Sequence, residues 1–319
     1  MNEVSIALIT DDNYVVPTIV TIASLLKSKK FRSQYDIYVL GHHLTPQNKS
    51  LLEKQGATVI ECEPKLPKCS AANAHVSVAA LLKFDLTNIF KKLDKILYLD
   101  TDMVILRDLS AFFNMDLGSH YAAVVKDMAG IKLEDCAGQI GHKNYFNSGM
   151  MLLNLKKMRA DKISEKLLDY KLHKDRGHFM DQDCLNAVFR ENVIYVSPVY
   201  NWMAPNQMRF DKKEIRKFYH LSKDLSLKNA VVVHLTNKQK AWDYADVWGH
   251  KLWKKYYKKS VLKHTKRCYQ NEKKLFGWEK SIDTEIFRFM GVPLAKIQHA
   301  ATKEKTYILG VRVKLKKRK

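Results

Sequence analysis

Residues 95–102 read Lys95-Ile96-Leu97-Tyr98-Leu99-Asp100-Thr101-Asp102, an apolar run that ends in two carboxylates. A short apolar run of this kind is typical of a buried strand. Asp100 and Asp102 are two positions apart, so in an extended chain their carboxylates project to the same side and can share one divalent cation. In open α/β sheets ligands bind beyond the carboxyl ends of the strands, which is where this pair falls.

The residues before this strand alternate between strand and helix patterns. We predict strands at 4–10, 35–40 and 58–62 and helices at 15–28, 46–55 and 76–90. This β-α-β-α-β order predicts a mostly parallel sheet covered by helices. The first strand ends in Asp11-Asp12-Asn13, which places a second acidic string at the carboxyl edge of the sheet.

The residues after Asp102 continue the same pattern. We predict further strands at 121–125, 149–155, 193–196 and 230–234 and helices at 162–173 and 182–191. With 319 residues, of which 46% are hydrophobic, the chain is long enough to bury a substantial core. The expected fold class is therefore α/β.

The pair formed by Asp100 and Asp102 is a weak metal signal by itself. A second Asp-x-Asp occurs at Asp181 and Asp183, and a solvated turn is the alternative explanation of such spacing. The first pair differs because it directly follows a buried strand. A cation there needs further ligands, which one imidazole and the oxygens of a nucleotide diphosphate would supply. His234 is the best-placed histidine because it closes an apolar run, although a histidine at a strand end is more often structural.

The spacing of the cysteines and the composition of the N-terminal residues indicate in which cellular compartment the protein is expected. The five cysteines are scattered and show neither Cys-x-x-Cys spacing nor a zinc-ligand pattern: Cys62, Cys69, Cys136, Cys184 and Cys268. Free thiols suit a reducing cytoplasm. Met1-Asn2-Glu3 carries no positive charge, and polar residues interrupt the longest apolar stretch, at 15–26. We expect neither a cleaved signal nor a membrane-spanning helix.

Six short strings stand in an order that resembles one family. They are Ile9-Thr10-Asp11-Asp12-Asn13-Tyr14, the string at 95–102, Tyr145-Phe146-Asn147-Ser148-Gly149, Asp181-Gln182-Asp183, Tyr200-Asn201-Trp202-Met203, and His234 with Lys240 and Trp242. On these strings the chain resembles the retaining glycosyltransferases of family 8, which include glycogenin and the bacterial lipopolysaccharide galactosyl- and glucosyltransferases. The resemblance covers about residues 4 to 242 and implies a nucleotide-sugar-binding fold of the GT-A type.

The resemblance also implies roles for individual residues. A UDP-sugar donor would be bound by Ile9, Asp11, Asn13, Lys83, Asp100, Thr101, Asp102, Asn147, Ser148, Asn237 and Lys240. Mn²⁺, with Mg²⁺ as the alternative, would be held by Asp100, Asp102 and His234. The catalytic residues beside the donor sugar would be Gln182, Asp181 and Asp127. Either Asp181 acts as a nucleophile or the acceptor attacks on the face of the leaving group.

Three positions depart from the family pattern. Lys83 stands where arginine is usual, and it keeps the charge but cannot form a bidentate fork. Asn237 replaces the usual glycine after the metal histidine, and Ala241 replaces the proline before the tryptophan. These changes put the shape of the phosphate loop and the donor preference in question, but they retain every proposed metal ligand.

The net charge of +22 is concentrated in the C-terminal part. Residues 251–319 carry 21 Lys and Arg against 5 Asp and Glu, a net of +16, interspersed with aromatic residues such as Trp253, Tyr256, Tyr257 and Tyr269. An apolar motif at 289–294 is repeated at 308–313. This composition favours an anionic membrane surface. A solvated basic face is the alternative, and nucleic acid is disfavoured because no nucleic-acid-binding motif accompanies the charge.

The sequence therefore predicts a catalytic domain at 1–248 and a basic amphipathic, membrane-associating tail at 249–319. We expect a retaining transferase that moves a hexose, galactose or glucose, from UDP-hexose to a glycolipid or lipid-linked oligosaccharide. Its product would belong to lipopolysaccharide, O-antigen or capsule synthesis at the cytoplasmic face of the cell membrane. The alternatives are a non-catalytic nucleotide-sugar-binding protein and a metal-dependent phosphoryl-transfer enzyme acting on nucleic acid. The sugar, the acceptor, the oligomeric state and the existence of a covalent intermediate stay open.

Overall fold

The computed structural model describes residues 2–65, 78–132, 144–174, 180–236, 238–265, 267 and 269, together with 277–280, 284–289, 292–300, 303–308 and 311–317. The chain divides into two compact units. The first comprises Met1–Asn237 and Leu252–His264, and the second comprises Lys238–Lys251 and Thr265–Lys319. The functions assigned to the predicted parts 1–248 and 249–319 stay predictions.

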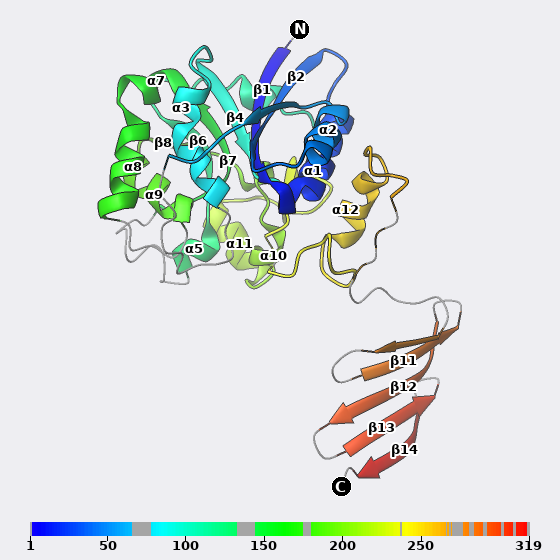
Figure 1. The fold of residues 1–319 in the computed structure, drawn as a ribbon. Coiled ribbons are helices and arrows are strands. Elements are labelled where there is room, and N and C mark those ends of the chain that lie inside the picture. The colour runs from blue at the N-terminus through cyan, green and yellow to red at the C-terminus, as the bar shows by residue number, and fades with distance from the viewer. Residues whose placement is uncertain are drawn as a thin grey trace. The chain divides into compact units, whose positions relative to one another are not determined.

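A seven-stranded sheet forms the framework of the first unit, in the order β3-β2-β1-β4-β7-β6-β8 (Figure 1). Its strands are β1 (Asn2–Asp11), β2 (Ser33–His42), β3 (Thr58–Glu61), β4 (Lys95–Leu99), β6 (Ala122–Lys126), β7 (Phe146–Asn154) and β8 (Val193–Tyr195). Neighbouring strands are parallel except where β7 pairs with β4 and β6. The predicted α/β fold with a mostly parallel sheet is confirmed.

The described residues also form helices, several of which pack against this sheet. They are α1 (Val15–Ser28), α2 (Pro46–Lys54), α3 (Leu86–Ile89), α4 (Ser110–Phe113), α5 (Met128–Lys132), α7 (Leu155–Ala160), α8 (Ile163–His173), α9 (Met180–Phe189), α10 (Ala204–Gln207), α11 (Lys212–Tyr219) and α12 (His250–Tyr257), with the 3-10 turns η1 (Asp12–Tyr14) and η3 (Pro198–Tyr200). In Figure 1, α1 and α2 lie beside β1 and β2, whereas α7, α8 and α9 form another group near β7 and β8. Nearly all of β4 and β7 is buried as a result. Within the part of the chain described here, no helix combines the length and the apolar character needed to cross a bilayer.

The helix predicted at 76–90 differs from the structure. Residues 76 and 77 lie outside the described residues, and the rest is a 3-10 helix, η2 (Val78–Asp85), followed by the short α3. Asp85 marks the break, because its carboxylate accepts a hydrogen bond from the Asn88 side chain (2.7 Å) at the start of α3. The predicted continuous helix is thus replaced by two shorter helical segments that meet at Asp85.

A second, two-stranded sheet pairs β5 (Met103–Ile105) with β9 (Val232–His234) in antiparallel fashion. The sequence predicts β9 within 230–234 but not β5, which is only three residues long. In the register of this sheet Met103 lies opposite His234. The pairing therefore brings Met103, which follows β4, next to a histidine that lies 131 positions later in the sequence.

Three aromatic residues that we predicted for a membrane interface lie instead in the core. Trp253 is 1% exposed, Tyr257 6% and Tyr256 7%. They follow Leu252, where the chain rejoins the first unit, and the backbone N–H of Val261 donates to the Gln55 side chain (2.9 Å). These three aromatic side chains therefore cannot contribute to a membrane interface in this structure.

The second unit contains a five-stranded antiparallel sheet with its strands in sequence order. These are β10 (Gly277–Lys280), β11 (Thr284–Phe289), β12 (Val292–Ala300), β13 (Lys303–Ile308) and β14 (Val311–Lys317). The register pairs Phe289 with Val292 and Ile308 with Val311. The two copies of the repeated apolar motif thus occupy equivalent positions in successive hairpins, and residues 290–291 and 309–310 lie outside the described residues.

Candidate active site

The Asp100-Thr101-Asp102 segment is held in place by β7 and α1. The backbone N–H of Asp100 donates to the carbonyl of Gly149 in β7 (2.7 Å). The Thr21 hydroxyl of α1 lies 2.8 Å from the carbonyl oxygens of both Thr101 and Met103 and donates to them. Polar side chains inside an otherwise apolar helix therefore satisfy the backbone of this segment and fix its path.

The pairing of β5 with β9 brings the three predicted metal ligands together. The Nε2 atom of His234 lies 2.9 Å from Oδ1 of Asp102 and 3.8 Å from Oδ2 of Asp100. One ligand atom from each residue lies within 4.8 Å of the others. The carbonyl of Asp102 also accepts the N–H of Leu235 (2.9 Å), which holds the two segments in register.

Asn201 orients the imidazole of His234. The Asn201 side-chain NH₂ donates to Oδ1 of Asn147 (2.8 Å), so its oxygen is the atom that lies 3.0 Å from Nδ1 of His234. This arrangement assigns the proton to Nδ1 and directs the Nε2 lone pair toward the two carboxylates. A lone pair facing a carboxylate oxygen is repulsive without a cation or proton between them. The donor set of one imidazole and two carboxylates therefore fits Mn²⁺.

Gly149 provides the space that these ligands need. A Cβ atom built at this position would lie 2.5 Å from Cε1 of His234 and 2.7 Å from Oδ2 of Asp100. Both distances are too short for any side chain to be tolerated without movement of the ligands. Gly149 belongs to one of the strings that carry the family resemblance, but the sequence alone does not reveal this steric role, nor that of Asn201.

Lys83 is a buried cation between two carboxylates. Its ammonium lies 2.6 Å from Oδ2 of Asp181 and 3.2 Å from Oδ1 of Asp100, and it lies over the ring of Tyr98. Burial lowers the pKa of Lys83, but the two carboxylates more than offset this and raise the pKa above its ordinary value. Lys83 is thus charged and links Asp100 to Asp181, while its predicted contact with the donor stays a prediction.

A hydrogen-bonded group at the start of α9 joins the other predicted site residues. The side-chain oxygen of Gln182 accepts the NH₂ of Asn147 and the backbone N–H of Ser148, both at 3.0 Å. The NH₂ of Gln182 donates to Oδ2 of Asp127 (3.3 Å). Oδ2 of Asp181 accepts the Ser148 hydroxyl (2.9 Å). All five residues are less than 10% exposed, so their orientations are set by one another.

Asn147 connects this group to the predicted metal ligands. Its side-chain oxygen accepts from Asn201, whose own oxygen faces His234, while its NH₂ donates to Gln182. A continuous chain of hydrogen bonds therefore runs from the imidazole of His234 to the carboxylate of Asp127. The structure brings together the predicted metal and sugar residues as one polar network.

The second Asp-x-Asp does not form a metal pair. Asp181 and Asp183 lie on α9, where residues two apart face different directions. Asp181 contacts Lys83, whereas Asp183 accepts the hydroxyl of Tyr145 (2.5 Å). Both carboxylates are buried and serve different parts of the core.

The remaining predicted donor residues are placed as follows. Ile9 is buried in β1, and Asp11 accepts the backbone N–H of Asn13 (3.0 Å) and of Tyr14 (3.2 Å), which shapes the loop after the strand. Asn237 lies outside the described residues. Lys240 belongs to the second unit, where its ammonium lies 5.4 Å from the ring centre of Trp242. Contacts of these residues with a donor stay predictions.

Comparison with known proteins identifies the family of the chain. The chain is 25% identical to the glycosyltransferase GlyF of Streptococcus pneumoniae, over 87% of this chain and 70% of that protein. It is 26% identical to a lipopolysaccharide 1,2-glucosyltransferase of Escherichia coli, over 80% of each. The crystal structure of the galactosyltransferase LgtC with donor and acceptor sugar analogues superposes with a TM-score of 0.70 at 24% identity, covering 81% of this chain and 96% of LgtC. The model of glycosyl transferase family 8 matches residues 5–246, so the chain belongs to this family of hexosyltransferases.

Proposed function

We propose that the protein is a Mn²⁺-dependent retaining transferase that moves glucose or galactose from a UDP-sugar to a glycan acceptor. Enzymes of this family typically use UDP-sugar donors and a divalent metal. The observation that carries the proposal is the network that joins Asp100, Asp102 and His234 to Gln182 and Asp127. The two candidate sugars follow from the E. coli glucosyltransferase and the galactosyltransferase LgtC among the similar proteins.

In this proposal Asp100, Asp102 and His234 would hold Mn²⁺, or Mg²⁺ as the alternative. When bound, the ion supplies positive charge where the departing diphosphate becomes most negative. Asn201 keeps the imidazole in the tautomer that a metal requires. Lys83 contributes a fixed positive charge beside Asp100 and balances the negative charge of the site.

The contacts of the sugar-side residues favour direct attack by the acceptor over a covalent intermediate. The Asp181 carboxylate is ion-paired with Lys83 and accepts the Ser148 hydroxyl, which weakens it as a nucleophile. The Gln182 oxygen already accepts two N–H groups, and an amide is a poor nucleophile in any case. We infer that Asp181 and Gln182 orient the donor sugar, while Asp127 faces the sugar and the acceptor.

We further propose that the acceptor is a glycolipid or lipid-linked oligosaccharide of lipopolysaccharide, O-antigen or capsule synthesis at the cytoplasmic face of the cell membrane. The basic C-terminal part supports this, because 265–319 carries 15 Lys and Arg against 5 Asp and Glu. The register of its sheet pairs Trp278 with Phe287, Phe287 with Ala295 and Ala295 with Ile308. A row of apolar residues among lysines is the composition of an interfacial membrane surface.

The decisive experiment is a screen of nucleotide sugars for metal-dependent hydrolysis by the purified protein. We expect UDP-glucose or UDP-galactose to be hydrolysed with Mn²⁺ and not after treatment with a chelator. Absence of hydrolysis with every nucleotide sugar, combined with tight UDP binding, would favour the non-catalytic alternative. Metal-dependent cleavage of DNA or RNA without any donor hydrolysis would favour the phosphoryl-transfer alternative.

A second experiment tests the sugar-side assignment. Gln182→Ala should lower kcat on the order of a hundredfold, because the donor sugar loses its oriented neighbour. Affinity for UDP alone should change little, since UDP lacks the sugar. Gln55→Ala is the matched control, because Gln55 is also a buried glutamine but bonds to Val261 instead. If Gln182→Ala lowers kcat and UDP affinity equally, Gln182 supports the fold and does not contact the donor sugar.

A third experiment tests the membrane role. Truncation should remove 265–319 and retain Leu252–His264, which belongs to the first unit. We expect intact hydrolysis of the soluble donor but weaker co-sedimentation with anionic vesicles. Salt should release part of the full-length protein, since the Debye length falls to about 3 Å at 1 M. If vesicle binding is the same with and without 265–319, these residues form a solvated basic surface and do not bind the membrane.

A further inference from the structure

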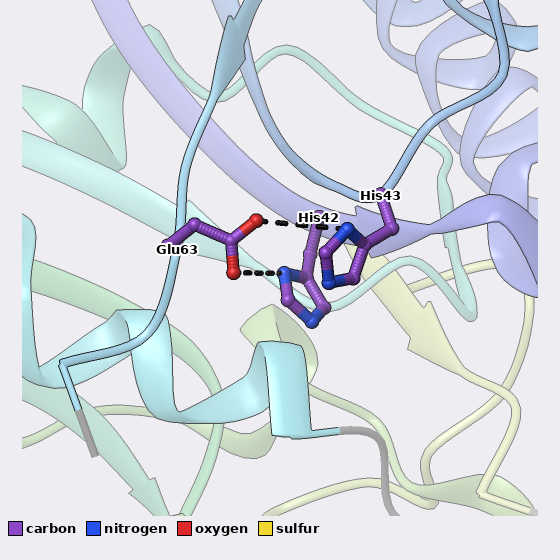
Figure 2. Close-up of side chains that lie close together, drawn as sticks. All are labelled: His42, His43 and Glu63. Carbon is purple, nitrogen blue, oxygen red and sulfur yellow. Dashed lines mark ion pairs between the residues drawn. The ribbon is translucent and has the colours of Figure 1, made fainter. Parts of the chain in front are cut away.

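Two histidines and a glutamate form a cluster (Figure 2). It shares no residue with the triad of predicted metal ligands, Asp100, Asp102 and His234. His42 is the last residue of β2, His43 follows it, and Glu63 comes two residues after β3. Nδ1 of His42 lies 3.3 Å from Oε2 of Glu63, and Nδ1 of His43 lies 3.6 Å from Oε1. Figure 2 shows the carboxylate of Glu63 facing both imidazole rings.

The backbone is bent so that both rings reach the same side. Consecutive residues of a strand normally project to opposite faces. His43 instead has φ of 53°, in the left-handed region that residues other than glycine seldom adopt, and the two ring centres are 4.0 Å apart. The neighbouring Gly41 supports this reversal, because a Cβ there would lie 2.4 Å from Cδ1 of Leu44.

The contact between His42 and Glu63 lacks hydrogen-bond geometry. Among the described residues, the buried Nδ1 atom of His42 has no hydrogen-bond partner, although the carboxylate oxygen is close to it. A buried polar atom without a partner is uncommon in a folded protein. A metal ion between the imidazoles and the carboxylate would satisfy the nitrogen by bonding to its lone pair.

We propose that His42, His43 and Glu63 form a Zn²⁺ site. Zn²⁺ bonds to imidazole and carboxylate at about 2.0–2.1 Å, which in a tetrahedron separates neighbouring ligand atoms by roughly 3.3 Å. The 3.3 Å from Nδ1 of His42 to Oε2 and the 3.6 Å from Nδ1 of His43 to Oε1 are close to this value, and each nitrogen faces a different oxygen of Glu63. Two histidines and one carboxylate leave the fourth position for water or another ligand. This set has two imidazoles, whereas Asp100, Asp102 and His234 have only one. The larger share of imidazole favours Zn²⁺ here over the Mn²⁺ or Mg²⁺ expected at those residues.

Cys62 stands between Glu61 and Glu63 in the sequence, but it is not a ligand of the proposed site. Its thiol does not lie with the ligand atoms of His42, His43 and Glu63. Its side chain packs against the main hydrophobic cluster. The proposed site therefore has three protein ligands, and it does not depend on the proposed transferase activity.

The test measures Zn²⁺ bound to metal-free protein by competition with a chromophoric chelator. Glu63→Gln and His42→Gln should each bind one Zn²⁺ fewer than wild type, with affinity at this site lowered about a hundredfold or more. Asp102→Asn should lose a different ion and keep this one. His173→Ala is the matched control, because His173 also contacts a carboxylate, Asp169, at 3.0 Å on the surface.

A spectroscopic measurement separates loss of binding from loss of folding. Co²⁺ in place of Zn²⁺ should give visible absorption in wild type and in Cys62→Ser, and these bands should weaken in His43→Asn. Asparagine tolerates the left-handed conformation of residue 43, so this variant keeps the turn and removes the ligand. Unchanged Zn²⁺ binding in Glu63→Gln and His43→Asn would overturn the proposal. An equal loss in His173→Ala would also overturn it, by identifying non-specific binding to surface histidines.

Discussion

Gly149→Ala adds a single methyl group to the centre of the proposed metal site. The new Cβ would lie 2.5 Å from Cε1 of His234 and 2.7 Å from Oδ2 of Asp100. Carbon atoms are in ordinary contact at about 3.5–4.0 Å, so the imidazole must retreat by roughly 1 Å. The same methyl group also displaces the Asp100 carboxylate, so both proposed ligands must move away from residue 149.

Neither ligand can retreat freely. His234 is 4% exposed, and its Nδ1 is tied to Asn201. Asp100 accepts the Tyr98 hydroxyl (2.7 Å) and is ion-paired with Lys83. Displacement of about 1 Å at a catalytic group costs on the order of a hundredfold in rate. Overpacking itself should lower the free energy of unfolding by about 1–3 kcal/mol, which leaves most molecules folded.

The assay is Mn²⁺-dependent hydrolysis of the UDP-hexose found in the donor screen, together with the Kd for Mn²⁺. We expect kcat to fall about a hundredfold and Mn²⁺ binding to weaken. Gly41→Ala is the matched control, since its Cβ would also meet a side chain, Leu44, at 2.4 Å, but not a ligand of the triad. If Gly149→Ala keeps kcat within tenfold and binds Mn²⁺ normally, the proposed metal geometry is wrong.

Three further predictions test separate parts of the structure. Asp102→Asn should lower turnover about a thousandfold or more while thermal unfolding stays near that of wild type; activity within tenfold at saturating Mn²⁺ would contradict its role as a ligand. Asn201→Ala should weaken Mn²⁺ binding by about 10–100-fold, measured by calorimetry, because the imidazole loses the group that orients it. Asp108→Asn should lower the free energy of unfolding by about 1 kcal/mol at neutral pH. Burial would raise the pKa of Asp108, but hydrogen bonds from the backbone of Lys30 and from Ser110 hold it below its ordinary value. Its stabilisation is therefore complete above the ordinary carboxyl pKa of about 3.9 and is lost as the pH falls toward the lower folded-state pKa. Denaturant titrations should show the wild-type advantage shrinking below about pH 4, and a constant advantage would contradict this account.

The strands and the Asp-x-Asp could be predicted because their signals are local. The apolar run before Asp100 identifies β4, and the alternation of helix and strand patterns predicts a parallel sheet. The start of β7 could not be predicted, because Asn147 and Ser148 are polar and suggest a loop. Both are buried in a strand because Gln182 and Asp181, which lie more than 30 residues away in the sequence, satisfy their polar groups.

The environment of His234 depended on a contact that no local pattern encodes. Its position at the end of an apolar run predicts β9, but the partner strand β5 has only three residues and follows the Asp-x-Asp directly. The role of Asn201 likewise could not be predicted, because only the folded chain brings its side chain next to the imidazole of His234. In the C-terminal part, the repeated motif predicts two similar surface elements, but the sheet itself depends on pairing among five short strands.

The buried polar network argues against a non-catalytic role for this fold. Lys83 and Asp181 form an ion pair in which neither side chain is more than 11% exposed. Replacing such a pair by well-packed apolar residues is often neutral or stabilising by about 1–4 kcal/mol. A protein that only binds a nucleotide sugar gains no stability from the buried charges of Lys83 and Asp181 next to the sugar-side residues. The same groups are useful if Asp100, on one side of Lys83, holds a metal and Asp181, on the other, orients a sugar. Variants on the two sides should then be coupled rather than additive, because they share Lys83 and the hydrogen bonds of Asn147.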